Sequence, residues 1–213
     1  MSLNLTKRYY NKHGLGYADF FADRYKRKML RLAEIKPSDV FYDLGCGNAN
    51  ILILAVSEFG IQKAVGYEDN PKRYHVALEN MKAAGLHDKI TVKREDLYNA
   101  DLSNADVIFD MLPESGDHFQ ELYANGIRKG TRLIKHDLPL IGYLPDATDH
   151  PFHRMTFPLT RAQSKEQWTS VVLGKNRSAP DDLWYDLYHY DYEKGYSKWD
   201  IRRMQNILSL RVP

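Results

Sequence analysis

Two acidic residues stand near the ends of short apolar runs, where buried strands would end. Asp43 lies in the run of residues 40–44, and Glu68 directly follows the run of residues 64–67. A carboxylate at a strand end can hold a cationic ammonium group or accept hydrogen bonds from a ribose diol. The two acids together suit a ligand in which an amino acid is joined to a nucleoside.

Two glycines follow Asp43. Gly45 and Gly47 flank Cys46, and an apolar run from residue 51 to 56 comes next. Because glycine has no Cβ, such a turn lets the backbone pass close to a ligand before a helix begins. The dinucleotide fingerprint would require a third glycine at position 50, where this chain has Asn50. The turn therefore argues against a pyrophosphate ligand.

The segment Asp43-Leu44-Gly45-Cys46-Gly47 resembles the first motif of the class I S-adenosylmethionine-dependent methyltransferases. The resemblance covers roughly residues 15–175 and implies S-adenosyl-L-methionine as the cofactor. It also implies that Glu68 is the ribose acid and that Glu95-Asp96-Leu97 is the turn in contact with adenine. The cofactor-binding residues expected on this basis are Asp43, Gly45, Cys46, Gly47, Asn50, Glu68, Asp69, Asp96, Leu97 and Asp110.

Over residues 18–145 the chain is more specifically similar to small archaeal protein-lysine methyltransferases, and more distantly to non-SET histone lysine methyltransferases. Shared segments are residues 63–66, which lead to Glu68, and residues 129–132, at the start of the fifth strand. This resemblance implies methyl transfer to lysine amines of proteins. Two alternatives remain: a small-molecule or RNA methyltransferase, and a regulatory or scaffold protein that binds S-adenosylmethionine.

The expected catalytic segment is residues 109–114, at the end of the fourth strand. Enzymes that methylate amino groups of nucleic acids usually have Asp or Asn, two prolines and an aromatic residue there, and this chain departs from that pattern at Met111, Leu112 and Glu114. Methyl transfer is an in-line displacement that needs a positioned, deprotonated nucleophile and no metal. The expected catalytic residues are Asp110, Pro113, Glu114 and Tyr17, the last following the glycines at 14 and 16.

Strand and helix signals alternate along the chain, which indicates βαβ units. The prediction is an α/β fold, a Rossmann-like three-layer α/β/α sandwich with a seven-stranded, mostly parallel sheet and a helical C-terminal extension. Residues 1–36 are expected to form an N-terminal helical cap with a helix at 18–33, residues 37–174 the methyltransferase core, and residues 175–213 an aromatic-rich extension packed on the core. A hairpin with strands at 154–159 and 168–173 is expected to complete the sheet. His150 and His153 are interpreted as ordinary loop histidines and His118 as a solvent-exposed residue at a helix start.

Composition sets the remaining expectations. The 213 residues, 43% of them hydrophobic, suffice for one domain with a substantial core. No run of 18 apolar residues or signal peptide is present, so a cytoplasmic protein without membrane contact is expected. A single cysteine excludes an internal disulfide and a cysteine-rich zinc site.

Charge is unevenly distributed. Residues 1–36 hold nine Lys or Arg against three Asp or Glu, whereas residues 181–200 hold six acids against two lysines. The basic helix could meet an acidic partner, although a solvated face is the commoner meaning of such a run. The net charge of only +2 makes nucleic acid the less favoured partner. We expect a lysine-rich protein as the substrate, and a protein that is a monomer or a weak dimer.

Overall fold

The computed structural model describes residues 23–111, 122–123, 126–136, 139–140, 142–149, 152–164, 167–168 and 170–171. Tyr17, Pro113, Glu114, His118, His150 and the extension at 175–213 lie outside these residues, so the expectations for them stay predictions. Within the described part of the chain, no helix is both long and apolar enough to span a bilayer.

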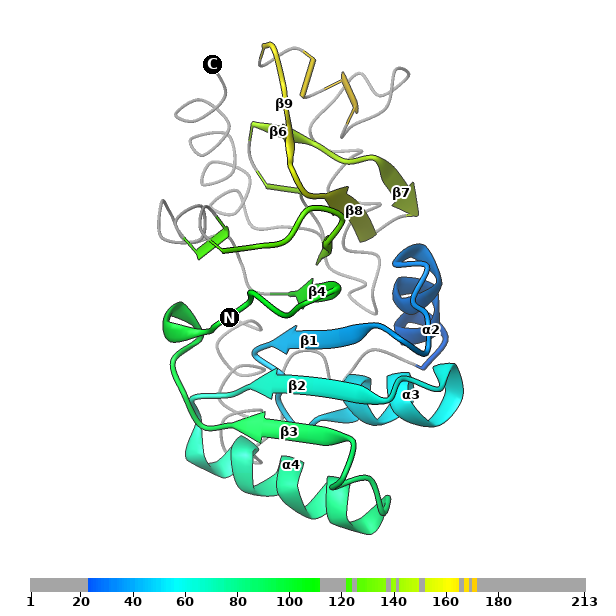
Figure 1. Cartoon of the computed structure of the whole chain (residues 1–213), viewed down its shortest axis with the longest axis vertical. Helices are drawn as coiled ribbons and strands as arrows, with labels where there is room; N and C mark the ends of the chain where they lie inside the picture. Colours follow the sequence, from blue (N-terminus) through cyan, green and yellow to red (C-terminus); the bar gives the residue numbers. More distant parts are fainter. Residues whose placement is uncertain are drawn as a thin grey trace, which may run out of the picture.

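A seven-stranded sheet forms the centre of the protein, with strand order β3-β2-β1-β4-β5-β8-β7 (Figure 1). The parallel strands are β1 (Val40–Leu44), β2 (Lys63–Tyr67), β3 (Ile90–Lys93), β4 (Val107–Asp110) and β5 (Arg132–His136). The antiparallel strands are β7 (Ala147–Asp149) and β8 (Phe152–Thr156), and a separate two-stranded sheet pairs β6 (Tyr143–Leu144) with β9 (Thr160–Arg161). The predicted Rossmann-like class with a mostly parallel seven-stranded sheet is confirmed.

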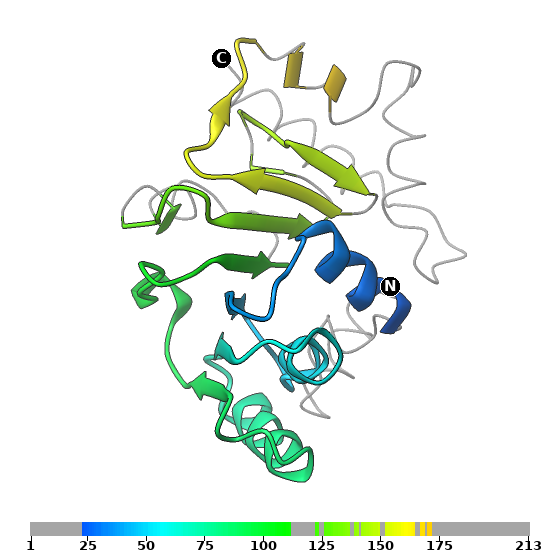
Figure 2. The same cartoon turned by 45° about the vertical axis from the view of Figure 1, so that its right-hand side comes forward.

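Three helices pack on one face of this sheet (Figure 2). They are α2 (Asp23–Leu32), α3 (Asn50–Phe59) and α4 (Pro71–Ala83), and their apolar side chains share a buried cluster with Phe41 and Phe109 of the sheet. The opposite face packs a second cluster that includes Tyr42, Leu44 and Ile108. Because neighbouring residues of a strand point to opposite faces, these clusters show toward which layer each strand residue points.

The predicted strand at 168–173 is wrong. The described residues of this segment, 167–168 and 170–171, are helical, and the seventh strand is β7 instead. Ser164 Oγ accepts a hydrogen bond from Gln167 N at 3.2 Å, and Trp168 N donates to Ser164 O at 3.1 Å. Ser-x-x-Gln is the spacing of a helix-capping box, so a helix start was encoded where the β-branched residues suggested a strand.

The strand predicted at 154–159 begins and ends earlier, as β8. Pro158 has no N–H to donate to a strand ladder, which explains why the strand does not continue to residue 159.

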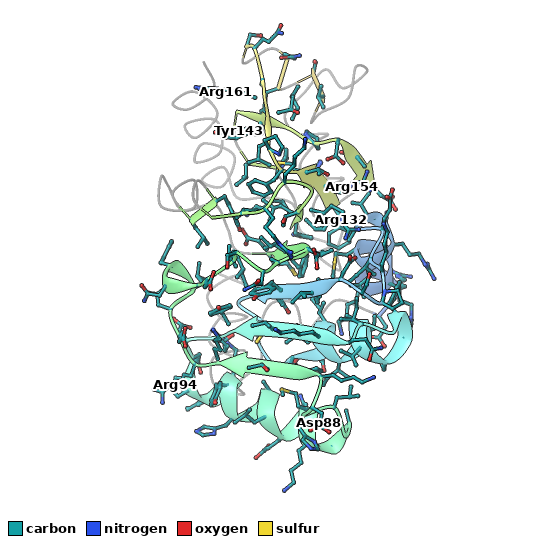
Figure 3. The ribbon with its side chains drawn as sticks, viewed as in Figure 1. Asp88, Arg94, Arg132, Tyr143, Arg154 and Arg161 are labelled. Atoms are coloured by element: carbon teal, nitrogen blue, oxygen red, sulfur yellow. The ribbon has the colours of Figure 1, made fainter. Side chains whose placement is uncertain are left out.

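Two arginines from the sheet hold the C-terminal end of α2 (Figure 3). Arg132 Nη1 donates to Ala33 O at 2.8 Å and to Glu34 O at 2.7 Å, and Arg154 Nη1 donates to Leu32 O at 3.2 Å. The last carbonyl groups of a helix have no partner within the helix, so donors from outside satisfy them. These contacts fix α2 against the start of β5 and the middle of β8.

Two basic residues of α2 are engaged with neighbouring elements of the protein. Arg27 forms two 2.6 Å hydrogen bonds with the Glu58 carboxylate of α3, and Lys28 pairs with Asp149 of β7 at 2.8 Å. The hydrogen bond with Glu58 raises the pKa of Arg27. These two cations therefore attach α2 to its neighbours, which leaves less of the basic run for an acidic partner.

Candidate functional site

The candidate site lies where the strand order reverses, at the carboxyl ends of β1 and β4. β1 pairs with β2 on one side and with β4 on the other, and open parallel sheets bind ligands outside the strand ends at such a switch point. Asp43 aligns with Gly66 of β2 and Phe109 of β4, so its side chain points to the sheet face that α2 and α3 cover. Asp43 is buried.

The turn after β1 has the conformation that its glycines predict. Gly45 has φ of 79° and Gly47 has φ of 57°, in the left-handed region that residues with a Cβ disfavour. The N–H groups of Gly45 and Cys46 both donate to Tyr67 O at 2.9 Å. The turn therefore folds over the end of β2 and comes close to Glu68.

Glu68 is buried and holds three elements together. Its carboxylate accepts hydrogen bonds from Gly47 N at 3.0 Å and Asn70 N at 2.9 Å, and it pairs with Arg73 of α4 at 2.8 Å. Asp69 beside it is exposed and lies 3.8 Å from the Arg73 guanidinium. Glu68 thus fixes the glycine turn and the start of α4. These structural roles were not part of the expectation, which was a contact with ribose.

Cys46 packs directly over Gly66. A Cβ at Gly66 would lie 2.6 Å from Cys46 Sγ and 2.7 Å from Leu52 Cδ1, distances too short for real contacts. Cys46 is buried and makes van der Waals contact with β2. The absence of a side chain at Gly66 therefore allows the turn and α3 to sit close to the sheet.

Asp96 and Leu97 follow β3 at the same edge of the sheet. Asp96 is exposed, and its carboxylate accepts a hydrogen bond from Tyr98 N at 3.0 Å, which caps the short 3₁₀ helix at Leu97–Asn99. Leu97 is half-buried. The position agrees with the turn expected from the sequence.

Asp110 is fully buried and lies in an ionic cluster. Its Oδ2 is 2.8 Å from the Lys135 ammonium of β5 and accepts a 2.6 Å hydrogen bond from the Tyr123 hydroxyl. Because Phe109 packs against the helices, Asp110 points to the opposite sheet face. The strand ends of Asp43 and Asp110 are therefore neighbours, but the structure does not bring the two side chains onto one face.

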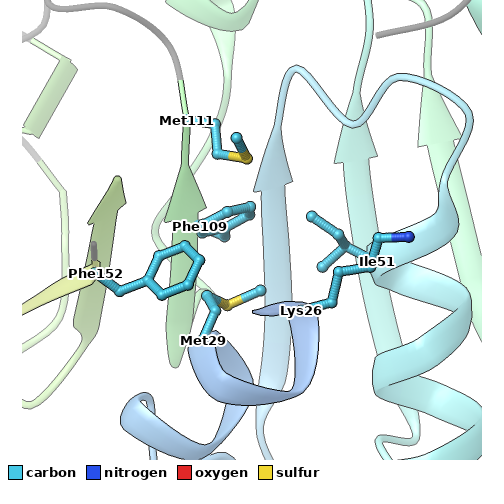
Figure 4. A pocket seen from close by; sticks show the side chains of 6 residues that line it. All are labelled: Lys26, Met29, Ile51, Phe109, Met111 and Phe152. Atoms are coloured by element: carbon cyan, nitrogen blue, oxygen red, sulfur yellow. The ribbon is translucent and has the colours of Figure 1, made fainter. Parts of the chain in front are cut away.

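A shallow hollow borders the site on the α2 side (Figure 4). Its walls come from α2, the start of α3, β4 and β8. The lining residues are Lys26, Met29, Ile51, Phe109, Met111 and Phe152. Five of the six side chains are apolar and Lys26 contributes its aliphatic stem, so the hollow suits an apolar group.

Of the two histidines predicted to lie in a loop, the structure describes His153. His153 lies within β8 and is completely buried, with its Nδ1 3.0 Å from Thr148 Oγ1, so the prediction of a loop residue is wrong. His136 at the end of β5 packs edge-on against Phe152. In the described part of the chain, no three His, Cys, Asp or Glu side chains gather as metal ligands.

Sequence reasoning missed three charged residues at this site. Lys26 precedes Met29 by three residues and Leu30 by four, which places it on the packed face of α2 and not on a solvated one. Lys135 interrupts the apolar strand β5, and Arg73 lies in the first turn after Glu68. For Lys26 and Lys135 the signal is a charge at a position that the apolar pattern marks as buried. For Arg73 the signal is its closeness to Glu68 in the sequence.

Two tyrosines pack against each other in the buried cluster on the second sheet face. Lys93 Nζ donates to the Tyr67 hydroxyl at 3.2 Å, and the Tyr42 and Tyr67 rings stack at 6.4 Å between centroids. The hydrogen bond with Tyr67 raises the pKa of Lys93, and burial raises the pKa of Tyr42. Lys93 is therefore held as a cation and Tyr42 as a neutral phenol at physiological pH.

Comparisons with known proteins agree with this geometry. The sequence model of the family described as ANTKMT methyltransferase domain matches residues 43–147. A protein-lysine N-methyltransferase from Saccharolobus islandicus is 31% identical over 120 residues, which are 56% of this chain and 74% of that protein. A ribosomal protein L11 methyltransferase from Oceanobacillus iheyensis is 26% identical over 149 residues, and the match spans only 45% of its length.

A solved structure is similar over nearly its whole length. The crystal structure of an RNA methyltransferase from Salinibacter ruber in complex with S-adenosyl-L-homocysteine has a TM-score of 0.62 and 30% sequence identity. The alignment covers 67% of this chain and 96% of that chain.

Proposed function

The chain belongs to the class I S-adenosylmethionine-dependent methyltransferases, and from this premise we propose that it transfers methyl groups to lysine amines of proteins. The observation that carries the lysine assignment is the 31% identity to a protein-lysine N-methyltransferase over 74% of that relative's length. The L11 methyltransferase match also concerns an enzyme named for a protein substrate.

The residues at the strand ends fit S-adenosyl-L-methionine, which supplies an electrophilic methyl group on a sulfonium when bound. We propose that the Asp43 carboxylate holds the ammonium group of the cofactor and that Glu68 accepts hydrogen bonds from the ribose. Arg73 Nε beside Glu68 is buried and lacks a hydrogen-bond partner within the described part of the chain, so a donor is available for a polar ligand there. Asp96 and Leu97 would border the adenine.

The turn residues have a separate proposed task. Gly45, Cys46, Gly47 and Asn50 form the backbone that passes under the cofactor, and Glu68 keeps this backbone in place through Gly47 N. Because the N–H groups of Gly45 and Cys46 are already bonded to Tyr67 O, the turn is held in its shape before a ligand arrives. A preformed turn lowers the entropy that binding must overcome.

The acceptor lysine requires a dry pocket. An amine with a reference pKa of about 10.4 must lose its proton before it attacks, and burial among apolar groups favours the neutral form. Phe109, Met111 and Phe152 line the hollow with such groups. We assign the acceptor amine to the crevice above this hollow.

The proposed catalytic residues have different tasks. Asp110, held by Lys135 and Tyr123, fixes the end of β4, and Pro113 and Glu114 follow it in the sequence. We propose that Glu114 receives a proton through water. Tyr17, six residues before α2 in the sequence, is proposed as an aromatic wall of the acceptor pocket.

A second candidate function is RNA methylation, because the 30% identical Salinibacter ruber structure is described as an RNA methyltransferase. The departure at Met111 and Leu112 from the segment typical of nucleic-acid amino methylation argues against methylation of base amino groups. Protein lysine is therefore the stronger proposal.

One experiment separates the two. The purified protein is incubated with methyl-labelled S-adenosyl-L-methionine and a cell lysate, which is then divided into protein, RNA and small molecules, with Asp43→Asn as the inactive control. The expected result is label in protein, with methyl-lysine identified by mass spectrometry. Label confined to RNA or to small molecules would contradict the lysine assignment.

A further inference from the structure

Lys26 is a buried charge on the wall of the hollow. Its side chain is 6% exposed and lies among Ile51, Phe109 and Met111, with its stem running beside Ile51 toward the loop between β1 and α3 (Figure 4). Met29, one turn further along α2, lines the same hollow. The ammonium group is therefore directed to the region where the glycine turn borders the site.

The ion-pair partner of this ammonium is weakly placed. Within the described part of the chain, Lys26 pairs with Asp23 at 3.1 Å, and the Asp23 side chain is 59% exposed. A pair with an exposed carboxylate contributes little, whereas a buried ammonium needs a close counter-charge. A ligand that brings an anionic group to the Lys26 ammonium would supply one.

Lys26 and Asp43 border the same side of the site. Asp43 aligns with Phe109, and Phe109 contacts the hollow that Lys26 lines. A carboxylate and an ammonium on one face of the sheet are complementary to a zwitterion, because each binds the opposite charge of an amino-acid group. The cofactor that the proposed function requires ends in such a group.

We propose that Lys26 binds the carboxylate of the cofactor's amino-acid end, while Asp43 binds its ammonium group. This inference rests on the proposed function and adds a residue of α2 to the cofactor site. The position of Lys26 depends on the position of α2, and Arg132 and Arg154 hold the C-terminal end of this helix.

The test compares two ligands by titration calorimetry on the full chain. S-adenosyl-L-homocysteine carries both charges of the amino-acid end, and its decarboxylated analogue, 5′-deoxy-5′-(3-aminopropylthio)adenosine, keeps only the ammonium. Lys26→Gln is expected to weaken S-adenosyl-L-homocysteine about 10- to 100-fold and to leave the analogue unchanged. Asp43→Asn is expected to weaken both ligands.

Three controls complete the design. Lys28→Gln removes a nearby cation that pairs with Asp149 instead of lining the hollow, and is expected to leave both affinities unchanged. Lys26→Arg keeps the positive charge and is expected to retain most of the affinity. Asp23→Asn removes the competing carboxylate and is expected to leave affinity for S-adenosyl-L-homocysteine unchanged or stronger.

The outcomes are distinct. Unchanged binding of S-adenosyl-L-homocysteine by Lys26→Gln, or an equal loss for both ligands, would overturn the inference and leave the proposed function standing. If Lys26→Gln does not fold, the same comparison on Lys26→Met decides. A wild-type protein that binds neither ligand would overturn the proposed function itself.

Discussion

Replacement of Gly66 by alanine tests the close contact between β2 and the glycine turn. The added Cβ would lie 2.6 Å from Cys46 Sγ, 2.8 Å from Cys46 Cβ and 2.7 Å from Leu52 Cδ1. Ordinary contacts of this kind begin at 3.4 Å, so each neighbour would have to move by more than half an ångström. Because Cys46 belongs to a hydrogen-bonded turn and Leu52 to a buried helix, neither can yield freely.

The expected cost follows from this overlap. Overpacking a buried site typically costs about 1–3 kcal/mol, and a domain of this size loses about 2–4 °C of Tm for each kcal/mol. Gly66→Ala should therefore lower the Tm by roughly 2–12 °C. Since the displaced Cys46 carries the turn, affinity for S-adenosyl-L-homocysteine should fall as well.

Thermal unfolding and calorimetry on a small set of variants measure both effects. Cys46→Ala removes the 2.6 Å contact but not the other two, so Gly66→Ala combined with Cys46→Ala should recover only part of the stability. Gly85→Ala is the control, because a Cβ there meets nothing within 4 Å and adds only the strain of a residue at φ 67°. If Gly66→Ala melts within a degree of the wild type, the argument from close packing is refuted.

Three further predictions concern the charged groups. Glu68→Gln should weaken S-adenosyl-L-homocysteine about 10- to 100-fold by calorimetry, and full affinity would speak against Glu68 as the ribose acceptor. Lys135→Met should cost about 3–5 kcal/mol in denaturant unfolding because it strands a buried carboxylate, while Asp110→Asn in the same chain should restore much of the loss; no recovery would contradict the pairing. The hydrogen bond with Arg27 lowers the pKa of Glu58 below its ordinary value of 4.5, so this pair stabilises the fold above pH 4.5 and its contribution is lost as pH falls through the lowered value. Melting curves from pH 6 to pH 3 should therefore converge for wild type and Glu58→Gln at the acid end, and parallel curves would disprove the linkage.

Local chemistry made the centre of the fold predictable. The glycines at 45 and 47 require the left-handed turn that the structure shows, and the apolar runs on either side can only be a buried strand and a helix. Asn70 and Pro71 mark the start of α4 through a side-chain cap and a fixed φ. These features depend on residues close together in sequence, so the sequence alone predicts them.

Features that depend on distant partners were missed. The burial of Lys135 requires Asp110, which is 25 residues away, and no periodicity reveals that the two strands are neighbours. Asp110 was expected at the crevice, yet its side chain points to the other face because Phe109 takes the helix-covered one. Ser164 and Gln167 have capping-box spacing, whereas the β-branched residues after Trp168 favour a strand, so the two local signals conflict.

Arginine side chains of the sheet hold α2 by its backbone, so these contacts do not depend on which side chains α2 carries. Arg132 and Arg154 reach the carbonyl oxygens of residues 32–34, and every amino acid carries that oxygen. A substitution on α2 can therefore change what lines the hollow while these three backbone anchors remain, and part of the information that positions α2 is carried by β5 and β8.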